Sequence, residues 1–162
     1  MAKFLTLNTH SWMEEEQETK LNQLAERILQ EKYDVICLQE VNQLTESEQV
    51  VQAPFYQAVE GAIAIHQDHF ALCLVEKLAE AGLDYHWSWA YNHIGFDIYN
   101  EGVAILSRNP MAPREVLVSE ANDPRDYHTR KVLLAETEVD GQLLTIASCH
   151  LSWWDKGFQG EW

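Results

Sequence analysis

The chain has 162 residues, of which 46% are hydrophobic and 10% aromatic, which suits one globular domain with its own core. Its 26 acidic residues outnumber 11 basic ones, so the formal net charge is −15 at pH 7. Such a chain repels polyanions, which argues against general nucleic-acid binding unless a local basic patch or a cation reverses the field.

The cysteines and the N-terminal stretch bear on the compartment. Cys37, Cys73 and Cys149 are odd in number, widely spaced and set in apolar runs, where a buried free thiol behaves as a small hydrophobic side chain. The stretch MAKFLTLNTH is too short in apolar residues for a secretion signal, and no run reaches membrane-spanning length. We therefore expect a reducing, cytoplasmic environment.

The first part of the chain predicts a strand, a helix and a second strand. Residues 3–8 are apolar and β-prone until Asn8, as in a buried strand that ends at a solvent-facing rim. Residues 16–32 place apolar side chains at helical spacing, with acids in the first turn. The run YDVICLQEV reads as a strand buried on both faces, reached by a crossover, so Glu40 should lie beside Asn8.

The rest of the chain predicts a loop, a helix and several strands. Residues 42–66 lack periodicity, and a helix then begins at Asp68 as its N-cap and stops at Gly82. The pair Asp140-Gly141 favours a tight hairpin between two later strands. The β-like runs are YHWSWAY, EGVAILS, REVLVS, RKVLLAETEV and QLLTIASCHL. A mainly antiparallel second half follows, within one domain over residues 1–162.

Three of the β-like runs end in polar side chains suited to a phosphate and metal site, namely Asn8, Glu40 and His150. Strand ends fix such side chains while the rim stays open. Mg²⁺ prefers carboxylate and amide oxygens together with waters and substrate phosphate, which makes Glu40 the best candidate ligand. Taken singly, each residue also has an ordinary interpretation: a solvated Glu, an Asn that closes a turn, a hydrogen-bonded His.

Four stretches resemble, in this order, segments of the endonuclease/exonuclease/phosphatase family: LTLNTHSW, DVICLQEVN, NEGVAILSRNP and LLTIASCHLSWW. The resemblance covers nearly the whole chain, and its most specific parts are Gln39-Glu40 and EGVAILSR. It implies an α+β fold, the four-layer α/β/β/α sandwich of the deoxyribonuclease-I-like type. The family includes deoxyribonuclease-I-like nucleases, inositol polyphosphate phosphatases and neutral sphingomyelinases.

The resemblance also implies roles for single residues. Glu40 matches the principal Mg²⁺ ligand, Asn8 the Asn that orients metal or phosphate, and His150 the His that hydrogen-bonds the phosphate. Arg130 matches a recurrent Arg, which either contacts substrate or forms a structural ion pair near the rim. The implied reaction is phosphoester hydrolysis assisted by Mg²⁺, with Mn²⁺ as the alternative metal. Gly102 is expected to mark close backbone packing.

The similar stretches THSW and CHLSWW, each of which follows an apolar run, have an explanation within this family. Both strands deliver their ends to one rim, so the two stretches are expected to form two walls of one cleft, with His10 and Trp12 flanking the substrate. Alternatively, Trp12, Trp153 and Trp154 cover the edge of the core.

The chain departs from the family pattern after HLSWW. An Asp-x-Asn and a terminal Asp-His pair, which supplies the general base, do not occur before Trp162. Asp68-His69 comes too early in the order and His66 and His69 lack further zinc ligands, so we interpret this segment as a helix cap. We expect an N-terminal portion of the domain, nearly inactive alone, with an uncovered sheet face that favours self-association.

The basic residues bear on the substrate. Five of the 11 fall between positions 108 and 131. They are Arg108, Arg114, Arg125, Arg130 and Lys131. Such a cluster either draws one phosphate to the cleft or forms a solvated face, and it is too small to track a duplex. A small or medium phosphoester is therefore favoured; the alternatives are a non-catalytic binding or assembly module on the same scaffold and, more weakly, a ring-stacking module built on the six Trp residues.

Overall fold

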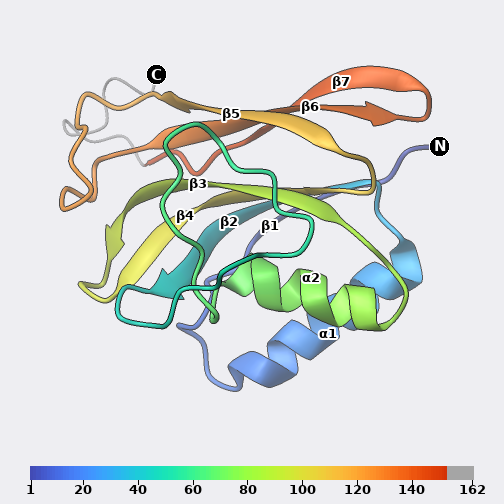
Figure 1. The fold of residues 1–162 in the computed structure, drawn as a ribbon, viewed down its shortest axis with the longest axis horizontal. Coiled ribbons are helices and arrows are strands. Elements are labelled where there is room, and N and C mark those ends of the chain that lie inside the picture. Colours follow the sequence, from blue (N-terminus) through green and yellow to red (C-terminus); the bar gives the residue numbers. More distant parts are fainter. Residues whose placement is uncertain (153–162) are drawn as a thin grey trace.

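The computed structural model describes residues 1–152, which form two β-sheets and two helices (Figure 1). The elements in chain order are β1 (Phe4–Asn8), α1 (Gln17–Glu31), β2 (Val35–Leu44), α2 (Phe70–Glu80), β3 (His86–Gly95), β4 (Tyr99–Ser107), β5 (Met111–Leu117), β6 (Lys131–Val139) and β7 (Gln142–Ser148). The predicted strands and helices are thus confirmed, with boundaries shifted by a few residues.

The first sheet has the strand order β1-β2-β4-β3, and β1 is parallel to β2 while the other pairs are antiparallel. The crossover through α1 makes the first pair parallel, as expected. The second sheet is the antiparallel meander β5-β6-β7, whose last hairpin turns at Asp140 and Gly141, both with positive φ. Positive φ at both positions matches the tight turn that the Asp-Gly pair favours.

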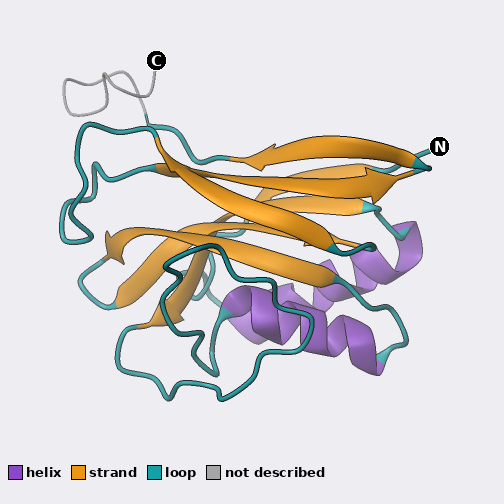
Figure 2. Ribbon diagram, turned by 45° about the horizontal axis from the view of Figure 1, so that its top comes forward, coloured by secondary structure: helices purple, strands orange, loops and turns teal. Residues whose placement is uncertain are grey.

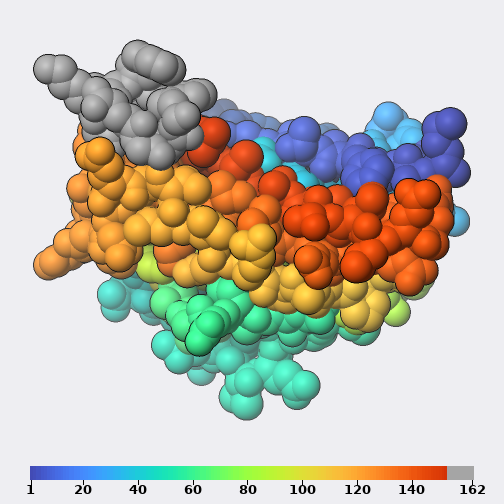
Figure 3. Space-filling model, turned by 90° about the horizontal axis from the view of Figure 1, so that it is seen from above, coloured from blue at the N-terminus to red at the C-terminus, as the bar shows by residue number. Residues whose placement is uncertain are grey.

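The elements stack as a helical layer and two sheets (Figure 2). One core lies between the helices and the first sheet and includes Ile28, Leu38 and Leu74, all 0% exposed. A smaller core lies between the sheets and includes Val103 and Leu133. The outer face of the second sheet presents the side chains of β5, β6 and β7 at the surface (Figure 3). Within residues 1–152, helices cover only the first sheet.

The connection between β2 and α2, residues 45–69, runs along the β3 edge and ties the two sheets together (Figure 1). Gln57 exchanges two hydrogen bonds with the backbone of Met111, at 2.7 Å each. The expected cap at Asp68 was wrong: the N-cap position of α2 is His69. The Asp68 carboxylate accepts bonds from Leu44 N, at 2.8 Å, and from Ser47, because closing this loop places it beside the end of β2.

Gly102 packs as the sequence predicted. A Cβ at this position would lie 2.2 Å from the Ala90 carbonyl oxygen and 2.5 Å from Trp89 Nε1, so only Gly fits. The three cysteines are free, and burial raises the pKa of Cys37 and of Cys73 to about 11 each. Cys149 is exposed, which corrects the expectation of a buried thiol there. None of the helices in residues 1–152 is long and apolar enough to cross a membrane.

Candidate active site

The position of Glu40 follows from a β-bulge. The β2–β4 ladder pairs Leu38 with Ala104 and resumes at Val41 with Gly102, so Gln39 and Glu40 fall between the two registers. Glu40 has φ of +51°, a conformation that costs energy for any residue with a Cβ. A bulge bends the strand and re-aims a side chain. Here it turns the Glu40 carboxylate out of the ladder and into a cleft at the sheet rim.

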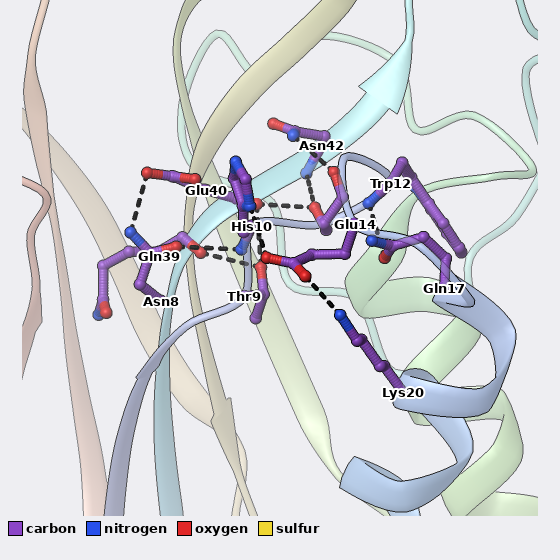
Figure 4. Close-up of polar contacts among 11 residues, drawn as sticks. Asn8, Thr9, His10, Trp12, Glu14, Gln17, Lys20, Gln39, Glu40 and Asn42 are labelled. Atoms are coloured by element: carbon purple, nitrogen blue, oxygen red, sulfur yellow. Dashed lines mark hydrogen bonds and ion pairs between the residues drawn. The ribbon is translucent and has the colours of Figure 1, made fainter.

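The β1–α1 loop holds Glu40 in this place (Figure 4). Asn8 Nδ2 donates to Glu40 Oε1 at 2.8 Å, and Asn8 Oδ1 accepts from His10 N at 3.0 Å. The Thr9 and Ser11 hydroxyls donate to the Glu40 carbonyl oxygen at 2.9 and 2.7 Å. Backbone and side chain of Glu40 are thus both fixed by one short loop. The sequence prediction that Asn8 and Glu40 lie together agrees with this geometry.

The structure separates the two residues expected to flank a substrate. His10 lines the cleft, and its Nδ1 lies 2.8 Å from Glu14 Oε1. Glu14 also pairs with Lys20, and the hydrogen bond from Lys20, followed by that from His10, lowers the pKa of Glu14 to about 2.

Trp12 does not face the cleft but packs against the core under the helices. Its Nε1 donates to the Asp68 carbonyl oxygen at 2.8 Å, and its ring packs edge-on against Phe70 with centroids 5.4 Å apart. It does not line the cleft that holds Glu40. Of the two interpretations of Trp12, the geometry therefore favours the one in which its ring covers the edge of the core. Trp153 and Trp154 lie outside the described residues.

His150, which follows β7, reaches the same cleft from the second sheet. Its Nε2 lies 3.7 Å from Glu40 Oε1. Burial lowers the pKa of His150, and the Arg130 guanidinium lowers it further, while the charges of Glu40 and Glu101 act in the opposite direction. The imidazole is therefore neutral at pH 7 and can donate or accept a hydrogen bond.

Arg130 lines the cleft and is only 6% exposed. Its Nε donates to Ser152 Oγ at 3.0 Å, and its Nη1 lies 3.4 Å from His93 Nδ1. A buried guanidinium is always charged and suits phosphate recognition. The structure thus brings Asn8, Glu40, Arg130 and His150, together with His10, to one cleft or its wall.

The cleft also contains a buried pair that was not assigned from the sequence, His93 and Glu101. They face each other in the β3–β4 register, both are buried, and His93 Nε2 lies 3.4 Å from Glu101 Oε1. Burial by itself would raise the pKa of Glu101, but the hydrogen bond with His93 and the charges of His93 and Arg130 outweigh it and hold that pKa below the usual value. In the sequence, Glu101 could have been noticed as a Glu at the start of the apolar run EGVAILS. His93 could not, because only the pairing of β3 with β4 places it beside Glu101.

The cleft has a volume of about 490 Å³. Its walls combine three carboxylates, three imidazoles and two guanidinium groups, of which that of Arg130 is buried, with several apolar side chains. In residues 1–152, no three His, Cys, Asp or Glu side chains come together in a way that could hold a metal by themselves. The Glu40 carboxylate, held by Asn8, instead offers a sparse oxygen set, the kind that Mg²⁺ completes with waters and substrate phosphate.

The protein therefore belongs to the class of two-sheet α+β proteins that carry a cleft at the sheet rim. The carboxylates, imidazoles and guanidinium groups of this cleft suit a phosphoester. The sequence profile of the endonuclease/exonuclease/phosphatase family matches residues 12–160, and the chain belongs to this family. Among curated proteins, none matches the chain.

Solved structures agree with the family assignment. An endonuclease/exonuclease/phosphatase family protein from Leptotrichia buccalis C-1013-b is 34% identical, with a TM-score of 0.82 over 94% of this chain and 54% of that one. D. rerio TDP2 complexed with single-strand DNA product is 14% identical, with a TM-score of 0.52 over 97% of this chain and 48% of that one. ANGEL2, a 2′,3′-cyclic phosphatase, is 17% identical, with a TM-score of 0.51 over 90% of this chain and 33% of that one. This chain thus spans about half the length of the Leptotrichia protein.

Proposed function

We propose that the protein is a metal-dependent phosphoester hydrolase of the endonuclease/exonuclease/phosphatase family. The observation that carries the proposal is Glu40, a strained bulge residue whose carboxylate is fixed by Asn8 and faces His150 in the same cleft as Arg130. Strained residues persist where the surrounding structure fixes them, and they cluster at functional sites.

Glu40 and Asn8 are the residues that would hold Mg²⁺, with Mn²⁺ as a possible substitute. The Glu40 carboxylate suits a hard cation that keeps several waters, whereas Asn8 Oδ1 already accepts from His10 N. When bound, the cation polarises a phosphoryl oxygen and offsets negative charge. Asn8 donates to one Glu40 oxygen and so orients the carboxylate.

Arg130 and His150 would bind the phosphate from the opposite wall, and His10 is proposed to contact the substrate from the β1–α1 loop. Arg130 supplies a fixed positive charge, and neutral His150 supplies a hydrogen bond. Because most of these groups are held by neighbours before substrate arrives, catalysis rests on positioning and on charge neutralisation.

The proposal concerns the full-length protein. The resemblance places the family's general base in a terminal Asp-His pair, and Asp68-His69 stands too early in the order to supply it, so we propose that residues 1–162 alone are nearly inactive. A second helical layer would complete the four-layer sandwich. Exposed apolar side chains on the edge strands, Phe4 on β1 and Leu143 on β7, support the predicted self-association of this portion.

We propose a small or medium phosphoester as substrate. Two structural neighbours carry phosphoester-related names or ligands, a DNA product for TDP2 and a cyclic phosphatase activity for ANGEL2. A long duplex is disfavoured because a net charge of −15 opposes the many phosphate contacts that duplex binding requires.

The test is hydrolysis of a generic phosphodiester and a phosphomonoester by the full-length gene product, with Mg²⁺, with Mn²⁺ and with EDTA. Glu40→Gln should lower kcat/KM at least about 100-fold, since the cation contributes several kcal/mol to the transition state. Glu80→Gln, at the exposed end of α2, is the matched control. Metal-independent turnover, or full activity of Glu40→Gln, would contradict the proposal, and an inert but ligand-binding protein would favour the non-catalytic scaffold.

A further inference from the structure

His93 faces the opposite side of the first sheet from the one that strict alternation along β3 would give it. Trp87, Trp89 and Tyr91 alternate along this strand and pack on the core under the helices. His93 comes next in that alternation, yet its Nδ1 lies 3.2 Å from Thr129 O, just before β6 of the second sheet. The register of β3 with β4 shifts between Tyr91 and His93, which indicates a β-bulge. The bulge therefore turns His93 away from the helices and into the cleft.

The same bulge places His93 beside a buried carboxylate. Glu101 pairs with His93 across β3 and β4 and lies on the same face of β4 as Val103, which packs between the two sheets. His93 Nε2 is 3.4 Å from Glu101 Oε1, and both residues are buried. Gly95 leaves room for this carboxylate, because a Cβ there would lie 2.8 Å from Glu101 Oε2. A bulge and a glycine thus both serve one contact between an imidazole and a carboxylate.

The other ring nitrogen of His93 faces Arg130, with Nδ1 and Nη1 3.4 Å apart. A neutral imidazole carries one proton, so one of its nitrogens donates and the other accepts. A proton on Nδ1 would bond Thr129 O and turn the lone pair of Nε2 towards Glu101. An ionised carboxylate only accepts, so the proton belongs on Nε2, and Nδ1 is left to accept from Arg130. Glu101 thereby sets which form of the ring Arg130 meets.

The contacts from Glu101 through His93 hold a planar cation at the cleft wall. Arg130 Nε also donates to Ser152 Oγ at 3.0 Å, and because the guanidinium is planar, placing Nε and Nη1 fixes the plane of the whole group. Buried charged groups contribute little to stability, since their desolvation offsets their attraction. Supporting contacts of this kind are instead what a binding group needs in order to keep one orientation.

We propose that His93, held by Glu101, is a positioning residue that orients Arg130 for the phosphate of the substrate. The inference rests on the proposed function, which assigns phosphate binding to Arg130. His93 acts on the phosphate only through the guanidinium. Any loss of binding caused at His93 should therefore depend on the presence of Arg130.

The first test locates the proton on the His93 ring by nitrogen NMR of the full-length protein in Mg²⁺, at mildly alkaline pH. Nε2 should carry the proton and Nδ1 should not. Arg130→Met should move the Nδ1 resonance, because it removes the donor. A proton on Nδ1, or on both nitrogens, would overturn the inference, since neither form can accept a hydrogen bond from Arg130.

The second test measures binding of inorganic phosphate to the full-length protein in Mg²⁺ by phosphorus NMR. His93→Phe should weaken binding roughly 10-fold, as the loss of one hydrogen bond to a charged group does. His93→Asn should stay within about 3-fold of the wild type, because its Oδ1 can replace Nδ1 as the acceptor. In an Arg130→Met background, His93→Phe should cause no further loss. His86→Phe is the matched control, because His86 lies on β3 outside the cleft and packs edge-on against Phe55.

Equal weakening by His93→Phe with and without Arg130 would overturn the inference, because the effect would then be structural. So would a wild type that binds no phosphate, or an Arg130→Met variant that binds it as well as the wild type. Because neither test needs turnover, the two proposals fail separately. A protein that shows the coupled loss and hydrolyses nothing keeps the inference and loses the hydrolase, whereas Mg²⁺-dependent hydrolysis that is insensitive to His93→Phe does the reverse.

Discussion

The two halves of strand β2 differ although they belong to one element. Val35–Leu38 pair with β4 in unbroken register and point apolar side chains into the two cores. Beyond the bulge, Asn42 and Gln43 are 0% exposed, yet they are polar. Asn42 Nδ2 donates to Ser11 O at 2.8 Å, and Gln43 Nε2 donates to Ala64 O at 3.0 Å.

The first half stabilises the sheet by burying apolar surface, and the second half adds buried hydrogen bonds to Ser11 in the β1–α1 loop beside the cleft and to Ala64 in the β2–α2 connection. Glu40 stands at the junction and takes a backbone conformation that neither half needs. Stability and the candidate site are therefore separable within a few residues of one strand.

The largest expected effect comes from the regular half. Leu38→Ala should lower the free energy of unfolding by about 2–5 kcal/mol, because Leu38 is fully buried in the core under the helices and the sheet cannot close the cavity. Urea denaturation of the wild type and the variant gives the value. A loss below about 1 kcal/mol would mean that this half does not carry the stability assigned to it.

The second prediction concerns the partner strand just past the bulge. Gly102→Ala should cost about 1–3 kcal/mol, because the new Cβ would press on the Ala90 carbonyl and the Trp89 ring. The same denaturation experiment applies, with Gly61→Ala as a comparison that meets no atom within 4 Å although its φ is +72°. Because Gly102 lacks the positive φ that strains an Ala at Gly61, a loss at Gly102 below about 1 kcal/mol would contradict the crowding argument.

The third prediction uses the buried ring that precedes α2. The His69 ring packs against Trp87 and Trp89, with ring centroids 5.0 and 4.6 Å apart. Burial, together with the charge of His66, lowers the pKa of His69 to about 3. Below pH 6.5 the unfolded chain takes up this proton before the folded one, so stability should fall as pH drops from 6.5 towards 3, by about 1.4 kcal/mol per unit. His69→Phe should remove that part of the slope; parallel curves for the two proteins would contradict this.

The smallest effect on stability is expected at Glu40. Glu40→Gly should leave the free energy of unfolding unchanged or raise it by up to about 1 kcal/mol, because Gly adopts positive φ without strain. Glu136→Gly, on the exposed face of β6, should instead lose about 0.5–1 kcal/mol. A loss above about 2 kcal/mol at Glu40 would show that its side chain serves the fold and would blur the comparison.

Much of the fold was predictable because it depends on local periodicity. The spacing of Leu21, Ala25 and Ile28 indicates α1, and all three are buried in the structure. Asp140-Gly141 indicates the last hairpin, and Gly102 indicates close packing. Asp68 shows the limit: the sequence allows it to cap α2 or to close a loop, and only contacts with Leu44 and Ser47 decide between them.

By itself, the sequence determined the order of the elements, the family and the presence of Asn8, Glu40 and His150 at strand ends. The tertiary structure decided which side chains share the cleft. It packed Trp12 against Phe70, paired His93 with Glu101 across two strands, and brought both of them to the cleft that Glu40 lines. The physical reason is that periodicity and turn propensity act over a few residues, whereas strand register, the bulge at Glu40 and burial bring together residues far apart in the chain.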